Sequence, residues 1–238
     1  MAPNTRSVLP EWMWLWVPCL LVLTLPAARL IGRDFHERWF NVKEGPIEWL
    51  TVAVLLPAIW AGIRAWQRRS LLPRPWLGAC VLVWTAAAIY VAGEELSWGQ
   101  TLFGWQTPES FRPLNQQSET NLHNLSSWLN EKPRTAFELW VLIGGLIMPL
   151  RLRKHALGVD DWRAWFWPPM LCVPTALVAL LVRLPDRIEK LAGDFTHPML
   201  ADMRLSEPQE FYFAYFLMIF LLSFEARLRA VEEASAGR

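Results

Sequence analysis

Cysteine is scarce in this sequence, with three residues among 238. All of them lie inside strongly apolar stretches, at Cys19, Cys80 and Cys172. Cysteine in such surroundings behaves as a small hydrophobic residue rather than as half of a disulfide or as a metal ligand. We therefore expect neither a disulfide framework nor a cysteine-based metal site.

An excess of charge of either sign is also missing. The 23 Lys and Arg residues nearly balance the 22 Asp and Glu residues, which leaves a net charge of +1. A chain without a strong positive field has no general attraction for nucleic acid, and we expect no nucleic-acid partner. The sequence also lacks a glycine-rich phosphate loop, a nucleophile elbow, a His-Glu-x-x-His motif and an internal repeat, so none of the classes that these motifs mark is indicated.

Long hydrophobic segments are what the sequence does have. Hydrophobic residues make up 53% of the chain, in blocks of roughly 20 residues, the length that crosses a bilayer core of about 30 Å. Tryptophan crowds the block edges, where its ring suits the depth of the lipid headgroups. We predict an all-α fold, a polytopic membrane helical bundle of about six transmembrane helices that forms a single integral membrane domain over 1–238. The predicted spans are 13–31, 47–66, 76–98, 135–152, 165–184 and 210–228.

The first block also has features of a cleaved signal peptide, with Arg6 before an apolar core and Ala27-Ala28 near its end. Its apolar run is long, however, and Glu11 intrudes at its start, so we expect the block to remain as a span. Prolines inside the spans predict kinks that neighbouring helices must compensate. They are Pro18, Pro26, Pro57, Pro149, Pro169 and Pro174.

The positions of Lys and Arg predict how the bundle is oriented. Dense basic clusters flank predicted spans at Arg68-Arg69 and over 151–154, and such clusters mark the cytoplasmic side. With six spans, the N- and C-termini lie on that side too. We therefore expect a multi-pass protein of the bacterial inner (cytoplasmic) membrane, with most of its acidic residues on the outer side.

One stretch is a stronger functional candidate than the rest of the chain. Gly93-Glu94-Glu95-Leu96-Ser97-Trp98-Gly99-Gln100 closes the third predicted span with two adjacent carboxylates. Ionisable groups in or at the edge of a membrane span are expensive, and they are functional candidates by default. The alternative is that Glu94 and Glu95 only mark the point where the helix enters water.

The loop over 99–134 is too long for a plain connector, and loops of this length are often functional. We expect it to be partly helical, because leucine and tryptophan form one stripe over 118–129. On such a helix Glu119 and His123 are four residues apart and project together, as two ligands of one metal or a carboxylate orienting an imidazole would. The alternative is an exposed pair that only stabilises the helix. Asn121 and Asn124 beside it are suited to hydrogen-bonding a sugar or a headgroup.

Other acidic residues are predicted to lie at the same depth. Glu48 is near the start of the second span, Glu138 near that of the fourth, and Glu207 and Glu210 near that of the sixth. Of the histidines in the outer loops, we expect His36 to be solvated and His197, which precedes Pro198, to be a loop residue.

These residues suggest a set of roles. We take Glu95, His123, Glu94 and Glu48 as the catalytic candidates, with Glu95 as base or ligand and His123 as ligand or acid. The substrate-binding candidates are Trp98, Gln100, Asn121, Asn124 and Glu210. The candidate metal ligands are His123, Glu119 and Glu95, for a divalent metal such as zinc, which lowers the pKa of its bound water.

Three segments resemble signatures of uncharacterised bacterial multi-pass membrane proteins. They are Glu44-Gly-Pro-Ile-Glu-Trp, the stretch from Gly93 to Gln100, and Glu119-Thr-Asn-Leu-His-Asn. This resemblance implies a location and a class but no activity. A looser comparison is with the alkaline-ceramidase-like membrane hydrolases, which set histidines and carboxylates within a helical bundle. This chain lacks their motif order and has six predicted spans rather than seven.

The first functional hypothesis is therefore an inner-membrane protein whose outward-facing Glu/His polar pocket performs metal-assisted hydrolysis or transfer on a lipid or glycan headgroup. The alternatives are a non-catalytic assembly or docking subunit and a small proton- or cation-coupled transporter. An enzyme would gather Glu48, Glu95, His123 and Glu210 in one place. A docking subunit would scatter these residues over the surface, and a transporter would line a path through the bilayer with them.

Overall fold

The computed structural model describes residues 8–41, 45–109, 127–192 and 205–237. Over these ranges the secondary structure is helical and includes no strand. Six helical segments are long and apolar enough to cross a membrane, and this confirms the predicted all-α polytopic bundle. They are Trp12–Ile31, Pro46–Gln67, Pro75–Glu95, Lys132–Leu152, Trp162–Leu181 and Ser206–Ala236.

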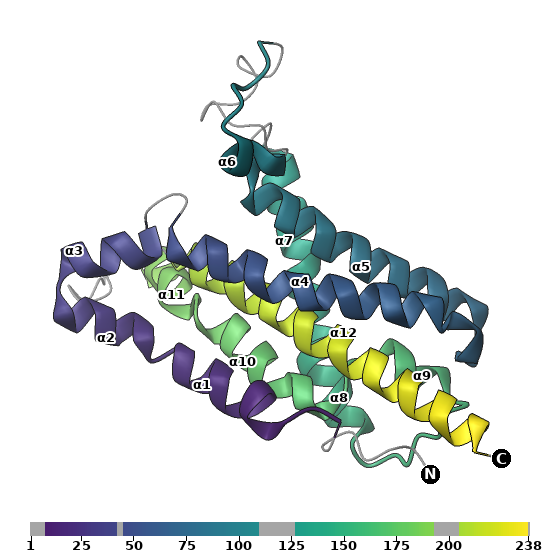
Figure 1. The fold of residues 1–238 in the computed structure, drawn as a ribbon. Helices are drawn as coiled ribbons and strands as arrows, with labels where there is room; N and C mark the ends of the chain where they lie inside the picture. Colours follow the sequence, from purple (N-terminus) through teal and green to yellow (C-terminus); the bar gives the residue numbers. More distant parts are fainter. Residues whose placement is uncertain (1–7, 42–44, 110–126, 193–204, 238) are drawn as a thin grey trace.

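The sixth span, α12 (Ser206–Ala236), is the centre of the bundle. It packs against α4 (Pro46–Gln67), α10 (Val173–Leu181) and α5 (Pro75–Glu95), and Figure 1 shows it running between these helices. Its middle is apolar on all sides, a pattern typical of a helix that is surrounded by protein. Phe216, Phe220 and Phe224 are accordingly fully buried.

Helices α4 and α5 form a hairpin that lies along α12. Each begins with proline in its first turn, where the missing N–H leaves no helical hydrogen bond unmade. The connection between them contains a short 3-10 turn, η3 (Arg69–Leu71). Arg68, just before this turn, pairs with Glu225 at 3.1 Å and with Glu232 at 2.7 Å on α12. These two ion pairs fasten the hairpin to the central helix.

Three spans are not single regular α-helices. Two of them break, and proline accounts for both breaks. The first span consists of the π-helix η1 (Trp12–Trp16), α1 (Val17–Leu21) and α2 (Thr24–Ile31), with its break four residues before Pro26. The fifth consists of α9 (Trp162–Phe166), η7 (Met170–Cys172) and α10, with an extended Trp167 before Pro168. The break before Pro26 is one of the predicted kinks, and the second break lies at Pro168, next to the predicted Pro169. Helix α4 continues through Pro57 without a break.

The fourth span changes its helix type instead of breaking. It consists of α7 (Ser127–Trp140), the π-helix η6 (Val141–Ile147) and α8 (Met148–Leu152). Gly145 lies where this span meets two others. A Cβ atom at this position would be 2.6 Å from Cε2 of Phe216 and 2.9 Å from Cβ of Ala176. Glycine is therefore needed for the close approach of the helices.

Short helices connect the spans at the end where α4 begins. They are α3 (Arg33–His36), η2 (Glu37–Asn41), η4 (Ser97–Gly99), α6 (Gln100–Phe103) and α11 (Leu184–Ala192). The third span ends at Glu95, not at Trp98 as expected. The fourth span begins at Lys132, three residues before its expected start. The predicted helix over 118–129 lies mostly outside the described residues.

The expectation that His36 is solvated was wrong. Its side chain is 1% exposed and packs against the ring of Phe40, with 5.2 Å between ring centroids. The reason is that the chain reverses at Gly32, so that α3 folds back on α2 and η2 packs against α4 and α12. His197 lies outside the described part of the chain.

Candidate functional site

Five glutamates from three helix ends form what we call the carboxylate cluster: Glu48, Glu94, Glu95, Glu207 and Glu210. Glu48 is in the first turn of α4, and Glu207 is in the first turn of α12. Glu94 and Glu95 are the last two residues of α5. The helices run so that these ends meet at one end of the bundle (Figure 1). Glu95 lies within electrostatic reach of the other four carboxylates.

Glu95 has unusual surroundings within this cluster. Its side chain is half-buried, and the charged groups that act on it most strongly are the other four carboxylates of the cluster. Among the described residues no Lys, Arg or His forms an ion pair with it. Half-buried carboxylates normally have a basic partner, because like charges in a low-dielectric site repel strongly. Carboxylates that crowd together without one tend to share protons.

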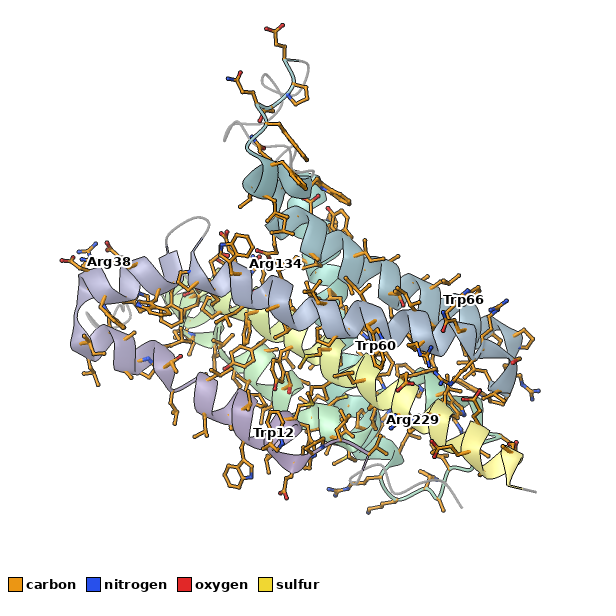
Figure 2. The ribbon with its side chains drawn as sticks, viewed as in Figure 1. Trp12, Arg38, Trp60, Trp66, Arg134 and Arg229 are labelled. Carbon is orange, nitrogen blue, oxygen red and sulfur yellow. The ribbon has the colours of Figure 1, made fainter. Side chains whose placement is uncertain are left out.

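Arginine from the fourth span lies beside the cluster. Nη1 of Arg134 pairs with Oε1 of Glu210 at 3.1 Å. Its Nη2 donates to Oε1 of Gln209 at 2.9 Å, and the buried Gln209 amide donates in turn to the carbonyl oxygen of Ala179 at 3.2 Å. This network joins α7, α10 and α12. Figure 2 shows Arg134 far from Trp66 and Arg229, which mark the opposite end of the bundle.

Two other arginines near this end have acidic partners of their own. Arg187 on α11 forms a close ion pair with Glu138 on α7. Arg183 pairs with Asp186 at 3.6 Å and also donates to Oε1 of Gln209 at 3.5 Å. Glu138 therefore belongs to a contact between α7 and α11. The sequence predicted that Glu138 lies at the depth of the other acids, but it did not indicate that Arg187 is its partner.

A tight turn follows the cluster directly in the chain. Ser97, Trp98 and Gly99 have φ angles of 46°, 54° and 99°, three consecutive residues in the left-handed region. The turn brings Trp98 back over the helix end, where its indole Nε1 donates to Oε1 of Glu94 at 2.5 Å. Beyond the turn, Gln100 donates to the hydroxyl of Thr107 at 3.2 Å.

The structure thus brings together four of the residues singled out from the sequence: Glu48, Glu94, Glu95 and Glu210. Trp98 donates a hydrogen bond to Glu94, and Gln100 donates one to Thr107. The proposed substrate-binding roles of Trp98 and Gln100 stay predictions. His123, Glu119, Asn121 and Asn124 lie outside the described residues, and their roles also stay predictions.

Two residues of this end were not singled out from the sequence, Arg134 and Gln209. Gln209 is one residue from Glu210, and Arg134 stands at the start of a span, so a polar residue at a span end was the only signal available. For the metal, the part of the chain that the structure describes contains no group of three His, Cys, Asp or Glu side chains arranged to hold an ion. Of the predicted ligands it describes only Glu95.

The interior between the two ends of the bundle is apolar. Its buried side chains include Leu55, Val81, Ala88 and Phe216, and the buried polar groups at this depth are hydroxyls such as Thr85. Within the described ranges the buried carboxylates are Glu94 at one end and Glu225 at the other. The transporter alternative required a polar path between these ends, so this arrangement disfavours it.

Comparisons of this chain with protein-family models, with curated proteins and with solved structures each found no match. What the chain does must therefore be inferred from the geometry of its own residues.

Proposed function

We propose that this chain is a membrane enzyme that hydrolyses, or transfers a group at, the polar headgroup of a lipid or a lipid-linked glycan. Glu95 is its base. The observation that supports this is the position of Glu95, a half-buried carboxylate among four others from three helices, with no basic partner in the described part of the chain. A carboxylate in such a place is suited to accept and release a proton.

The depth of the cluster favours a headgroup as the substrate. Glu48, Glu95 and Glu210 lie near the ends of apolar spans that reach the same side of the bundle. This is the level where the acyl chains of the bilayer give way to the headgroups. Exposed tryptophan side chains, Trp49 and Trp98, lie at the same level. Tryptophan at this depth is typical of the membrane interface. A lipid already in the bilayer would reach the cluster without leaving the membrane.

The proposed reaction needs one proton acceptor and one proton donor. Glu95 takes a proton from water as the water oxygen bonds to the carbonyl, phosphoryl or glycosidic centre. The bond from that centre to the leaving oxygen breaks, and His123 returns a proton to the leaving oxygen. In the transfer reaction an acceptor hydroxyl replaces water. In the metal-dependent alternative, His123, Glu119 and Glu95 would instead hold a divalent metal such as zinc, which would supply the activation of the attacking water by lowering its pKa.

We further propose that the protein lies in a bacterial inner membrane with the carboxylate cluster outside and both termini in the cytoplasm. The opposite end of the bundle supports this orientation, because it carries two groups of exposed basic residues that directly flank spans. They are Arg64, Arg69, Arg151, Arg153 and Lys154.

The direct test uses the purified full chain in liposomes made from the total polar lipids of its source cell. Lipids are followed by mass spectrometry over time for loss or exchange of a headgroup, with Zn²⁺, Mg²⁺ or Mn²⁺ added or removed by a chelator. We expect Glu95→Gln to lower the rate at least about a hundredfold, the contribution of a general base.

Glu11→Gln is the matched control, because Glu11 is an exposed carboxylate beside the first span. It should turn over lipid at the wild-type rate. The proposal is overturned if wild-type protein changes no lipid under any of the metal conditions, or if Glu95→Gln is as active as wild type. Loss of activity with the chelator and its return with one metal would assign the water activation to that metal.

A further inference from the structure

We infer that the two adjacent glutamates have separate tasks: Trp98 anchors Glu94, and this anchored pair positions Glu95 toward Glu48 and Glu210. The inference rests on the proposed function for what Glu95 does, and on the geometry of the turn for how Glu95 is held. It makes Trp98 and Glu94 positioning residues and leaves Glu95 as the reactive group.

The surroundings of the two carboxylates differ. Glu94 is buried, at 7% exposure, and accepts the hydrogen bond from the Trp98 indole at 2.5 Å. Glu95 is half-buried, and its charged neighbours include Glu210, Glu207 and Glu48 on other helices. Consecutive residues of an α-helix project about 100° apart. Fixing Glu94 toward the turn therefore directs Glu95 to another side of α5.

The backbone of the turn shows that Trp98 is held in place. Ser97 and Trp98 are the only residues other than glycine with positive φ in the described part of the chain, and they are adjacent. Each such residue costs about 1 kcal/mol or more and persists only where the surroundings impose it. A helix can end with a single left-handed glycine. Ending α5 does not by itself require two strained residues, so contacts of the turn must hold them, and the hydrogen bond from Trp98 to Glu94 is one such contact.

Two glycines leave space for this arrangement. A Cβ atom at Gly93 would be 3.0 Å from Cε3 and Cζ3 of the Trp98 ring, so the indole lies directly on the glycine backbone. Gly99 has φ of 99°, and a Cβ there would be 2.8 Å from Cη2 of Trp105. The motif from Gly93 to Gln100 thus forms one device, in which the glycines allow the tryptophan to reach the first of the two glutamates.

The test compares variants that remove different parts of this device. Trp98→Phe keeps an aromatic ring and removes the N–H donor. Glu94→Gln keeps an oxygen that can accept the bond, and Glu94→Leu does not. Trp60→Phe is the control, since Trp60 is an exposed tryptophan, at 54%, in the middle of α4 and away from the turn.

The first readout needs no substrate. Dicyclohexylcarbodiimide reacts with carboxyl groups that hold a proton and face an apolar phase, and mass spectrometry locates the modified residue. We measure modification of Glu95 across a pH series in liposomes. Trp98→Phe and Glu94→Leu should move the pH at which half of the Glu95 reactivity is lost, and Trp60→Phe should not. Glu95→Gln should abolish the modification at this position.

The second readout is headgroup turnover. Trp98→Phe should lower kcat by about tenfold to a hundredfold, as a small misplacement of a reacting group does, and change KM by less than about twofold. Glu94→Gln should lose less turnover than Glu94→Leu, because its amide oxygen still accepts from the indole. Size-exclusion profiles confirm that each variant is folded.

The two readouts separate this inference from the proposed function. If wild type turns over no lipid but the Glu95 modification follows the expected pattern, the proposed function fails and the positioning of Glu95 stands. If the carbodiimide modifies Glu95 in Trp98→Phe and Glu94→Leu with the same pH dependence as in wild type, the positioning role of Trp98 and Glu94 is refuted, whatever the turnover. The same conclusion follows if Glu94→Gln is as impaired as Glu94→Leu.

Discussion

Nη1 of Arg227, on α12, donates a hydrogen bond of 2.5 Å to the carbonyl oxygen of Ala164, on α9. In an unbroken helix this oxygen would accept from the N–H of the residue four positions later, but that residue is Pro168, which has no N–H. Arg227 supplies the missing donor. Its Nε also donates to the carbonyl oxygen of Ser223 at 3.1 Å, and its guanidinium lies 5.1 Å from the ring centroid of Trp165.

Arg227→Met should therefore destabilise the bundle by about 2 kcal/mol, the contribution of a hydrogen bond from a charged donor. The measurement is the unfolding midpoint in mixed micelles with increasing dodecyl sulfate. Arg229→Met is the control, because Arg229 is exposed and its nearest acidic partner, Glu233, is 3.9 Å away. Equal midpoints for the two variants would contradict the role given to Arg227.

Gly145→Ala tests the contact between the fourth span and α12. The added methyl group would overlap Phe216 and Ala176, and overpacking of this kind costs about 1–3 kcal/mol. The same unfolding measurement applies. Gly158→Ala should be neutral, since nothing lies within 4 Å of a Cβ at that glycine. A Gly145→Ala protein as stable as wild type would mean that the helices are not in close contact there.

His36 predicts a pH dependence of stability. Burial, and next to it the charge of Arg29, lowers the pKa of His36 below its ordinary value of 6.5. Between that lowered pKa and 6.5 the unfolded chain binds a proton that the folded chain does not. Stability should therefore fall as the pH is lowered from 7 through the region below 6.5.

His36→Phe should remove this part of the pH dependence. It should also raise stability at pH 7 by about 1 kcal/mol, because both ring nitrogens of His36 are buried without a hydrogen-bond partner among the described residues. The measurement is the unfolding midpoint at pH 5.5 and pH 7.5. His155→Phe, at an exposed histidine, is the control. If the slope with pH is the same in His36→Phe and wild type, the buried imidazole is not its source.

The proposed orientation can be tested with single cysteines in a chain whose three native cysteines are replaced by alanine. Glu109→Cys lies beyond α6, on the side of the bundle where α5 ends, and Lys154→Cys follows α8 at the other end. Both positions are exposed. In intact cells a membrane-impermeant maleimide should label Glu109→Cys and reach Lys154→Cys only after lysis. The reverse pattern would invert the topology.

Much of the fold could be predicted from the sequence because bilayer thickness fixes the length of an apolar block. The second span was expected over 47–66 and extends over Pro46–Gln67. The meeting of Glu48, Glu95 and Glu210 at one end follows from the same reasoning, since alternate span ends face the same side. What sequence periodicity does not give is the rotation of each helix about its axis, on which the contact of Arg134 with Gln209 and Glu210 depends.

The local surprises have a different physical cause. Ser97 and Trp98 adopt left-handed conformations that their own side chains disfavour, so no local propensity could have ended α5 at Glu95. His36 is buried by a reversal of the chain at Gly32, which a polar sequence such as Asp34-Phe-His-Glu-Arg does not suggest. In both cases contacts across the fold override the preference of the residue.

The central helix α12 has a consequence for how the protein is made. It follows the other five spans in the chain, yet it supplies Glu210 to Arg134 and Glu225 to Arg68. Because a chain is synthesised from its N-terminus, the earlier spans leave the ribosome before these acids exist. Assembly of the bundle therefore waits for the segment that is translated last of the six. A substitution that delays membrane insertion of α12 would leave Arg68 and Arg134 without these acidic partners. We expect membrane proteases to degrade such an incomplete bundle.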